Sequence, residues 1–314
     1  MALIDIKNSL NCSLSSIIGA GSKGCDFDPE NLDFIRLVPK GLVIPPDADY
    51  NREYIRNLQI AGNYIALPRL FDYEWQSEED QTETAASTGQ EVVGRKGLYK
   101  LMCKWSSKVN LQKVLSSLES FDTWGVILVD KNGTELYAET SAGGMRGFSA
   151  GRVSADPISW KTGADSNKVS LMIQFTNSAQ FNSSLAWNSY EFLDYTPEDI
   201  DGINQAALSI PTAPATGVKD VVVKAVCKGG NDFAAGIVKS QFLVKVGGVT
   251  QTGVTVVADS SSNTYTLTLP AALNTSDIVT VDLFDATVPS SVIRVGAAPD
   301  DLLFKAVTAT TVVV

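Results

Sequence analysis

Residues 97–130 read GLYKLMCKWSSKVNLQKVLSSLESFDTWGVILVD and contain the clearest succession of secondary structure in the chain. Residues 97–105 alternate apolar and polar side chains, which predicts a half-buried β-strand. Residues 109–121 instead place apolar side chains three and four positions apart, on one face of a helix. The members of that face are Leu111, Val114, Leu115, Leu118 and Phe121. Residues 123–130 are almost entirely apolar and predict a buried strand, so the order is strand, helix, strand.

The sequence that follows this region predicts further strands. Asn132-Gly133 is a strong hairpin signal, because both residues tolerate a positive φ, and residues 134–140 would form the returning strand. Residues 168–175 (KVSLMIQF) have the pattern of an alternating strand and would face residues 146–160 across a polar turn. We therefore expect an α+β domain, a β-sandwich or barrel with one packed helix.

The composition of the chain changes near residue 210. All five tryptophans lie before that point, and residues 1–210 carry 18 basic and 27 acidic residues, against 7 and 8 in residues 217–314. Between them PTAPATG (211–217) is small, uncharged and Pro-rich, as linkers are. Residues 218–314 consist of short β-branched runs, the pattern of a small antiparallel sandwich. We expect a mainly β chain with domains at 1–210 and 218–314, the last strand being formed by residues 307–314.

The charge and the absence of histidine narrow the possible functions. The net charge is −10, so the surface as a whole does not suit wrapping around nucleic acid. The missing histidine removes the usual general base at neutral pH and the commonest metal ligand. The four cysteines are far apart and form no Cys-x-x-Cys pair, which argues against a zinc site. We expect no enzymatic activity, no cofactor, no metal ion and no membrane-spanning segment.

Two short motifs resemble functional signatures. Residues 147–151 (GFSAG) fit the nucleophile elbow of α/β-hydrolases, but that chemistry needs a histidine and a strand-to-helix turn. We interpret Gly147 and Gly151 as positions where a strand bends or approaches a neighbour closely. Residues 19–24 (GAGSKG) fit a dinucleotide fingerprint, but no helix is predicted after them, so we expect an N-terminal arm there.

Residues 72–94 form an acidic stretch without lysine or arginine. It is polar and rich in serine and threonine, so we expect a long surface loop. Such a loop is either a solvated excursion or a segment that orders against a neighbouring subunit. The residues proposed for that intersubunit contact are Glu74, Glu78, Glu79, Asp80, Glu83 and Glu91.

The order of these elements resembles that of phage tail tube (major tail) proteins. The resemblance covers roughly residues 35–195 and rests on the acidic loop, the helix VNLQKVLSSLESF, the strand TWGVILVD and the late pair GMRGFSAGRVSADPISW and KVSLMIQFTNSAQF. Residues 218–314 resemble, in pattern, the immunoglobulin-like modules appended to phage virion proteins. The resemblance implies a virion protein, assembled in the bacterial cytoplasm, whose hexameric rings stack into a tube. The implied partners are further copies of itself, other tail proteins, DNA in transit and host glycans bound by residues 218–314.

Two alternatives remain open on the sequence. The chain could be another virion part with an immunoglobulin-like domain, such as a capsid, decoration or fibre protein. It could also be a carbohydrate-binding module in which Trp124, Trp160 and Trp187 stack on sugars. Because these tryptophans fall mostly within predicted strands, we expect them to pack in the core instead.

Overall fold

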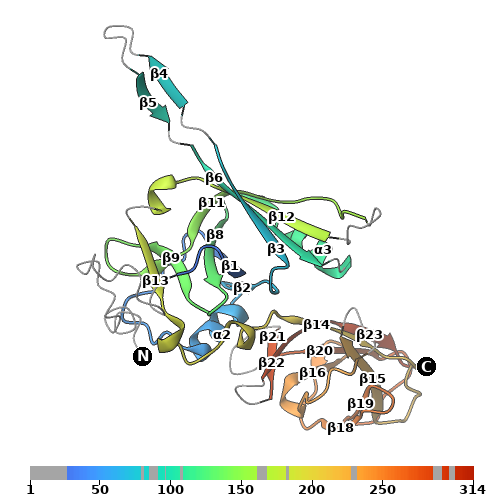
Figure 1. Ribbon diagram of the computed structural model, residues 1–314. Coiled ribbons are helices and arrows are strands. Elements are labelled where there is room, and N and C mark those ends of the chain that lie inside the picture. Colours follow the sequence, from blue (N-terminus) through green and yellow to red (C-terminus); the bar gives the residue numbers. More distant parts are fainter. Residues whose placement is uncertain are drawn as a thin grey trace. The chain divides into compact units, whose positions relative to one another are not determined.

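The computed structural model shows a mainly β chain that divides into two compact units, Met1–Ile200 and Asp201–Val314 (Figure 1). The structure describes residues 27–78, 81–84, 91–95, 97–106, 109–160, 168–181, 184–227, 232–285, 292–296 and 301–314. For residues 81–84, 91–95, 109–110, 178–179 and 191 it describes the backbone alone. The predicted arm at residues 19–24 and the turn at 161–167 lie outside the described residues.

Eleven described strands of the first unit form one sheet that folds over at a corner. They are β1 (Leu32–Pro39), β2 (Ile65–Ala66), β3 (Asp72–Ser77), β6 (Tyr99–Ser106), β7 (Ser120–Phe121), β8 (Trp124–Asp130), β9 (Glu135–Glu139), β10 (Met145–Arg146), β11 (Phe148–Ala155), β12 (Lys168–Phe175) and β13 (Leu185–Asn188). β1 pairs along the whole of one edge of β8. The other edge of β8 is shared, since β11 pairs with its first half and β9 with its second half. β11 then continues into the second part of the sheet, in the order β11-β12-β6-β3.

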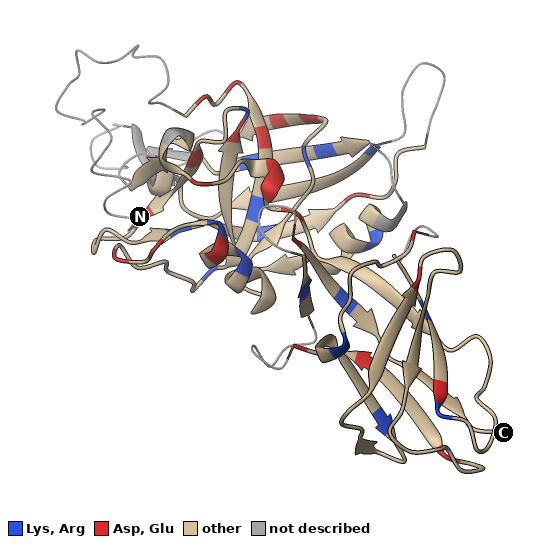
Figure 2. Ribbon diagram, turned by 90° about the horizontal axis from the view of Figure 1, so that it is seen from below, with Lys and Arg blue, Asp and Glu red and all other residues tan. Residues whose placement is uncertain are grey.

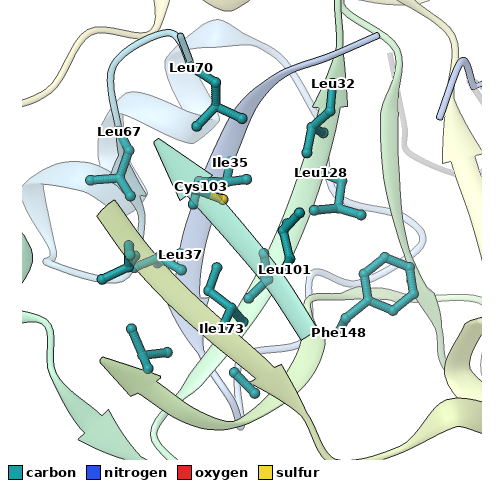
Figure 3. Close-up of a cluster of buried hydrophobic side chains, with 14 of the residues drawn as sticks. Leu32, Ile35, Leu37, Leu67, Leu70, Leu101, Cys103, Leu128, Phe148 and Ile173 are labelled. Atoms are coloured by element: carbon teal, nitrogen blue, oxygen red, sulfur yellow. The ribbon is translucent and has the colours of Figure 1, made fainter. Parts of the chain in front are cut away.

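The main core of the first unit lies between these two parts of the sheet. Figure 3 shows Ile35 and Leu37 of β1 pointing into the same cluster as Leu101 of β6 and Ile173 of β12. A second cluster lies on the opposite face of β1, β8 and β9, and Ile127 of β8 is part of it. β8 is therefore buried on both faces, which explains its unbroken apolar sequence.

Two glycines of β10–β11, Gly147 and Gly151, make the corner possible. A Cβ atom built on Gly147 would lie 2.5 Å from the carbonyl carbon of Gly125 and 2.5 Å from the amide nitrogen of Val126. A Cβ atom on Gly151 would lie 2.3 Å from Cγ2 of Thr176, and the β11–β12 register shifts beside it. Our interpretation of Gly147 and Gly151 is therefore confirmed. Strands flank the motif on both sides, so it is not a nucleophile elbow.

Most of the predicted elements of the first unit are present, with three differences. The helix predicted for residues 109–121 is α3 (Val109–Ser117), and it packs against β11 and β12. Ser120 and Phe121 instead form β7, which pairs with β11, so Phe121 is 76% exposed rather than part of the helical face. Val114 of that face is also exposed. In the β8–β9 hairpin Gly133 has a φ of 94°, whereas Asn132 does not adopt a positive φ.

The mainly β fold is confirmed, and in addition to the one packed helix that was expected, the described residues contain a second helix, α2 (Arg52–Ile60), that was not predicted. Asn51 caps it by accepting a hydrogen bond from the Tyr54 amide at 2.8 Å. Its inner face carries the arginines Arg52 and Arg56 beside Ile55, and all three are buried. Because buried arginines break the apolar periodicity, the usual helix pattern is missing from this sequence.

The second unit is a β-sandwich of two sheets around a core of aliphatic and aromatic side chains. One sheet has the order β18-β19-β15-β14-β22-β21 and the other β17-β16-β20-β23. The strands are β14 (Asn204–Ser209), β15 (Asp220–Cys227), β16 (Phe242–Val246), β17 (Val249–Thr250), β18 (Thr255–Asp259), β19 (Thr264–Thr268), β20 (Ile278–Leu283), β21 (Val292–Val295), β22 (Leu302–Val307) and β23 (Ala309–Val312). An antiparallel sandwich was predicted, but β14 and β22 run parallel, so one of its two sheets is mixed. β23 pairs with β20 and is the last strand, as expected.

The boundary between the units differs from the predicted linker at 211–217. β14 lies before that stretch and pairs with β15 and β22 of the sandwich. The stretch itself is hydrogen-bonded within the second unit, because the Thr216 amide donates to the Val314 carbonyl and the Gly217 amide to the Leu273 carbonyl. A Pro-rich, uncharged sequence here forms part of a folded connection, so the change in composition does not mark the division between the compact units.

Candidate functional site

The outer edge of β3 is the first element of the candidate site. Among the described strands β3 pairs with β6 alone, in an antiparallel ladder from Asp72↔Lys104 to Ser77↔Tyr99. The Glu78 amide continues this ladder by donating to the Leu98 carbonyl at 3.0 Å. Hydrogen-bonding alternates along such a ladder, so the backbone groups of Trp75 and Ser77 point to the opposite, outer edge. An edge of this kind is a template for strand addition.

The carboxylates of this edge are paired with lysines of the neighbouring strand. Lys104 Nζ lies 3.2 Å from Asp72 Oδ2 and 3.5 Å from Glu74 Oε2, and Lys100 Nζ lies 2.8 Å from Glu78 Oε1. Burial opposes ionisation of Lys104, but Asp72 and Glu74 raise its pKa overall. Figure 2 shows the described lysines and arginines in blue and the described aspartates and glutamates in red. Two lysines of β6 therefore offset part of the negative charge of Asp72, Glu74 and Glu78.

The stretch predicted as one long loop contains strands. Residues 72–77 form β3, and a two-stranded sheet follows, made of β4 (Gln81–Thr84) and β5 (Glu91–Arg95) (Figure 1). In this hairpin Glu83 lies opposite Val92 and Thr84 lies opposite Glu91. Glu79 and Asp80 lie outside the described residues. The sequence signals that could have predicted them are the alternation in DYEWQS, the adjacent β-branched Val92 and Val93 in EVVGR, and AASTGQ between the hairpin strands.

An aromatic groove adjoins the end of β3. It has a volume of about 620 Å³ and is bordered by side chains of β3, β6 and β13. Trp75 stacks on Phe175 with a centroid distance of 5.9 Å and meets Phe181 edge-on at 6.1 Å. The described lining residues are Phe27, Pro29, Trp75, Gln76, Ser77, Tyr99, Leu128, Leu136, Phe181, Leu185 and Trp187. Sequence reasoning missed this groove because its aromatic residues come from separate stretches of the chain between Phe27 and Trp187, which only the fold brings together.

The tryptophans of the carbohydrate-binding alternative have different environments. Trp124 and Trp187 pack against the main core, and the indole nitrogen of Trp124 donates to the Leu118 carbonyl at 3.0 Å. Trp160 is 65% exposed. Of the three, Trp187 borders the aromatic groove described above. The described lining of that groove is mainly apolar, so it offers few partners for sugar hydroxyls.

Groups with potential chemistry are few in the described part of the chain. Burial raises the pKa of the Cys103 thiol, which is fully covered and therefore a poor nucleophile. Ser149 of the GFSAG motif has Gln180 as its neighbour, because the Ser149 amide donates to the Gln180 side chain at 2.8 Å. Within the described residues no three His, Cys, Asp or Glu side chains gather as a metal site would require. Neither described helix has the length and hydropathy needed to span a membrane.

Comparison with known proteins adds no assignment: no family model matches the sequence, and no curated protein is significantly similar to it.

Proposed function

We propose that this chain is a virion structural protein whose copies assemble into stacked, hexameric rings that form a phage tail tube. The observation that carries the proposal is the outer edge of β3, which has no pairing strand among the described residues and is followed by the separate β4–β5 hairpin. Identical subunits that offer such edges can join head to tail, and these contacts close into a ring when the rotation permits.

The organisation into two units supports the same proposal. The first unit carries the free edge, the hairpin and the aromatic groove, whereas the second is a self-contained sandwich with its own core. We infer that the first unit assembles and that the second, an immunoglobulin-like decoration domain, provides contacts to other tail proteins or to host glycans. DNA would pass through the tube without tight binding, since the chain is net acidic.

The use of the β3 edge can be tested with one pair of variants. Ser77→Pro removes an amide that points to the outer edge, so it should block strand addition while leaving the β3–β6 ladder in place. Ser77→Ala keeps that amide and is the matched control. We expect negative-stain microscopy of the purified chain to show hollow filaments of stacked rings for the Ala variant and none for the Pro variant.

Each other outcome of this experiment has a meaning. Filaments formed equally by both variants would show that the β3 edge is not the assembling surface. Closed shells or spikes would favour the alternative role as a capsid, decoration or fibre protein. A wild-type chain that remains monomeric at all concentrations and is absent from viral particles would contradict the proposed function.

A further inference from the structure

Glu135 is a buried carboxylate that joins distant parts of the first unit. It lies on β9 and is 2% exposed. The Tyr50 hydroxyl donates to its Oε2 at 2.7 Å, and the Tyr195 hydroxyl donates to its Oε1 at 2.8 Å. Both tyrosines are themselves buried. One carboxylate thus connects the loop before α2, the strand β9 and the segment that precedes the second unit.

Other polar groups enclose this carboxylate. Asn188 of β13 supplies a neutral amide, and Arg36 of β1 supplies a positive charge. Tyr64 and Tyr137 lie near enough for the charge of Glu135 to raise their pKa values, although burial is the larger cause for both. The titratable or charged groups around Glu135 are therefore Arg36, Tyr50, Tyr64, Tyr137 and Tyr195.

Residues 193–200, here called the 193–200 segment, are held by the first unit at several further points. The Arg52 amide donates to Asp194 Oδ1 at 3.0 Å. Arg36 Nη2 donates to the Pro197 carbonyl at 2.7 Å, and Arg56 Nη2 donates to the Asp199 carbonyl at 3.0 Å. The two arginine contacts do not titrate in the physiological range, because a guanidinium stays protonated.

We propose that Glu135 makes the attachment of the 193–200 segment to the first unit dependent on pH, with a tighter attachment in acid. The hydrogen bond between Tyr195 and Glu135 joins the segment directly to this buried carboxyl group, so the segment helps to cover it. Opening of the 193–200 segment would expose the Glu135 carboxyl group to water.

The direction of this pH dependence follows from the burial of the Glu135 carboxyl group. Burial raises the pKa of Glu135, and the hydrogen bonds from Tyr50 and Tyr195 and the charge of Arg36 offset this only in part. The closed state therefore binds the proton more tightly than the open state. The stabilisation is complete below the pKa of the open state and is lost as the pH rises through the higher pKa of the closed state.

Hydrogen exchange of the full-length chain, followed by mass spectrometry between pH 5 and 8 and corrected for intrinsic exchange rates, measures this attachment. In the wild type we expect protection of the 193–200 segment to fall as the pH rises. Glu135→Gln keeps the shape but cannot ionise, so its protection should not change with pH. Glu198→Gln is the matched control, because Glu198 is an exposed carboxylate of the same segment, and it should behave as the wild type.

Tyr195→Phe gives an independent measurement if Glu135→Gln does not fold. It removes the hydroxyl and keeps the ring, so protection of the segment should be lower at every pH. The fall of protection with rising pH should remain, because Glu135 is still buried and can still ionise. A reference peptide from β20 in the second unit should show no such dependence in any variant. Equal pH dependence in the wild type and in Glu135→Gln, or unchanged protection in Tyr195→Phe, would overturn the proposal.

Discussion

The two units differ in what fills their interiors. The second unit has an interior of aliphatic and aromatic side chains, and Asp301 is its one buried charged or polar residue among those described. The first unit buries many such residues within the described part of the chain: Arg36, Arg52, Arg56, Gln59, Asp130, Thr134, Glu135, Gln180, Asn188 and Ser189. Buried polar groups are costly unless they are paired, and their pairing restricts which segments can meet. The first unit therefore depends on particular contacts, and the second mainly on packing.

The largest loss of stability should come from a substitution at the corner of the sheet in the first unit. Gly147→Ala would place a Cβ atom 2.5 Å from the backbone of Gly125 and Val126, and backbone cannot move aside cheaply. We expect a loss of more than about 3 kcal/mol in the first unit, above the usual cost of overpacking. Calorimetry should show the transition of the first unit lowered or absent and that of the second unit unchanged.

Gly41→Ala is the control for this substitution. It lies in the same unit, has no atom within 4 Å of the added Cβ and needs no positive φ. Its stability should match that of the wild type. If Gly147→Ala destabilised both units to the same extent, the two cores would not be independent and the comparison between them would lose its basis.

The same contrast explains what could be predicted from the sequence. Strands β8 and β12 and the sandwich strands were predictable because one-sided or complete burial leaves a clear apolar pattern in residues such as those of KVSLMIQF. The helix α2 was not, because its buried positions include Arg52, Arg56 and Gln59. The candidate site was partly predictable: the acidic character of residues 72–94 was evident, but the pairing of Glu74 and Glu78 with lysines of β6 depends on strand register.

The two units should unfold at different alkaline pH values. Burial raises the pKa values of Tyr50, Tyr64, Tyr137 and Tyr195 in the first unit, and the charge of Glu135 adds to this. In the second unit the corresponding residue is Tyr265, whose pKa burial also raises. A raised folded-state pKa stabilises the fold below the unfolded pKa of about 10 and loses that contribution as the pH rises above it. Among the described residues, four such tyrosines are buried in the first unit and one in the second, so the first unit should unfold at the lower pH.

Tyrosinate absorbance and circular dichroism, recorded together during a titration from neutral to strongly alkaline pH, test this order. The four tyrosines should ionise only as the first unit loses its structure. Early ionisation of these residues in a folded first unit would show that their hydroxyls are more accessible than the structure indicates. Removal of the carboxylate charge by Glu135→Gln should move the first transition to higher pH.

The smallest effect on stability should come from removing the ion pairs between β6 and the edge strand β3. Lys104→Met keeps most of the apolar stem of the side chain and removes the ion pairs with Asp72 and Glu74, which are about half exposed. Pairs of this kind contribute about 0–1 kcal/mol, so denaturant unfolding of the first unit should change by less than about 1 kcal/mol. A loss above about 2 kcal/mol would mean that Lys104 belongs to the buried polar network and not to the surface.

Assembly should respond to Lys104→Met more strongly than stability does. Without Lys104 the carboxylates of Asp72 and Glu74 on β3 lose their positive partner, and their charge would oppose the approach of another acidic copy at low salt and less so at high salt. We therefore expect a higher concentration threshold for filament formation at low ionic strength, recovered as salt is added. Lys219→Met in the second unit changes the net charge equally and should leave the threshold unchanged. An equal shift in both variants would assign the effect to overall charge, and the edge of β3 would then have no special role in assembly.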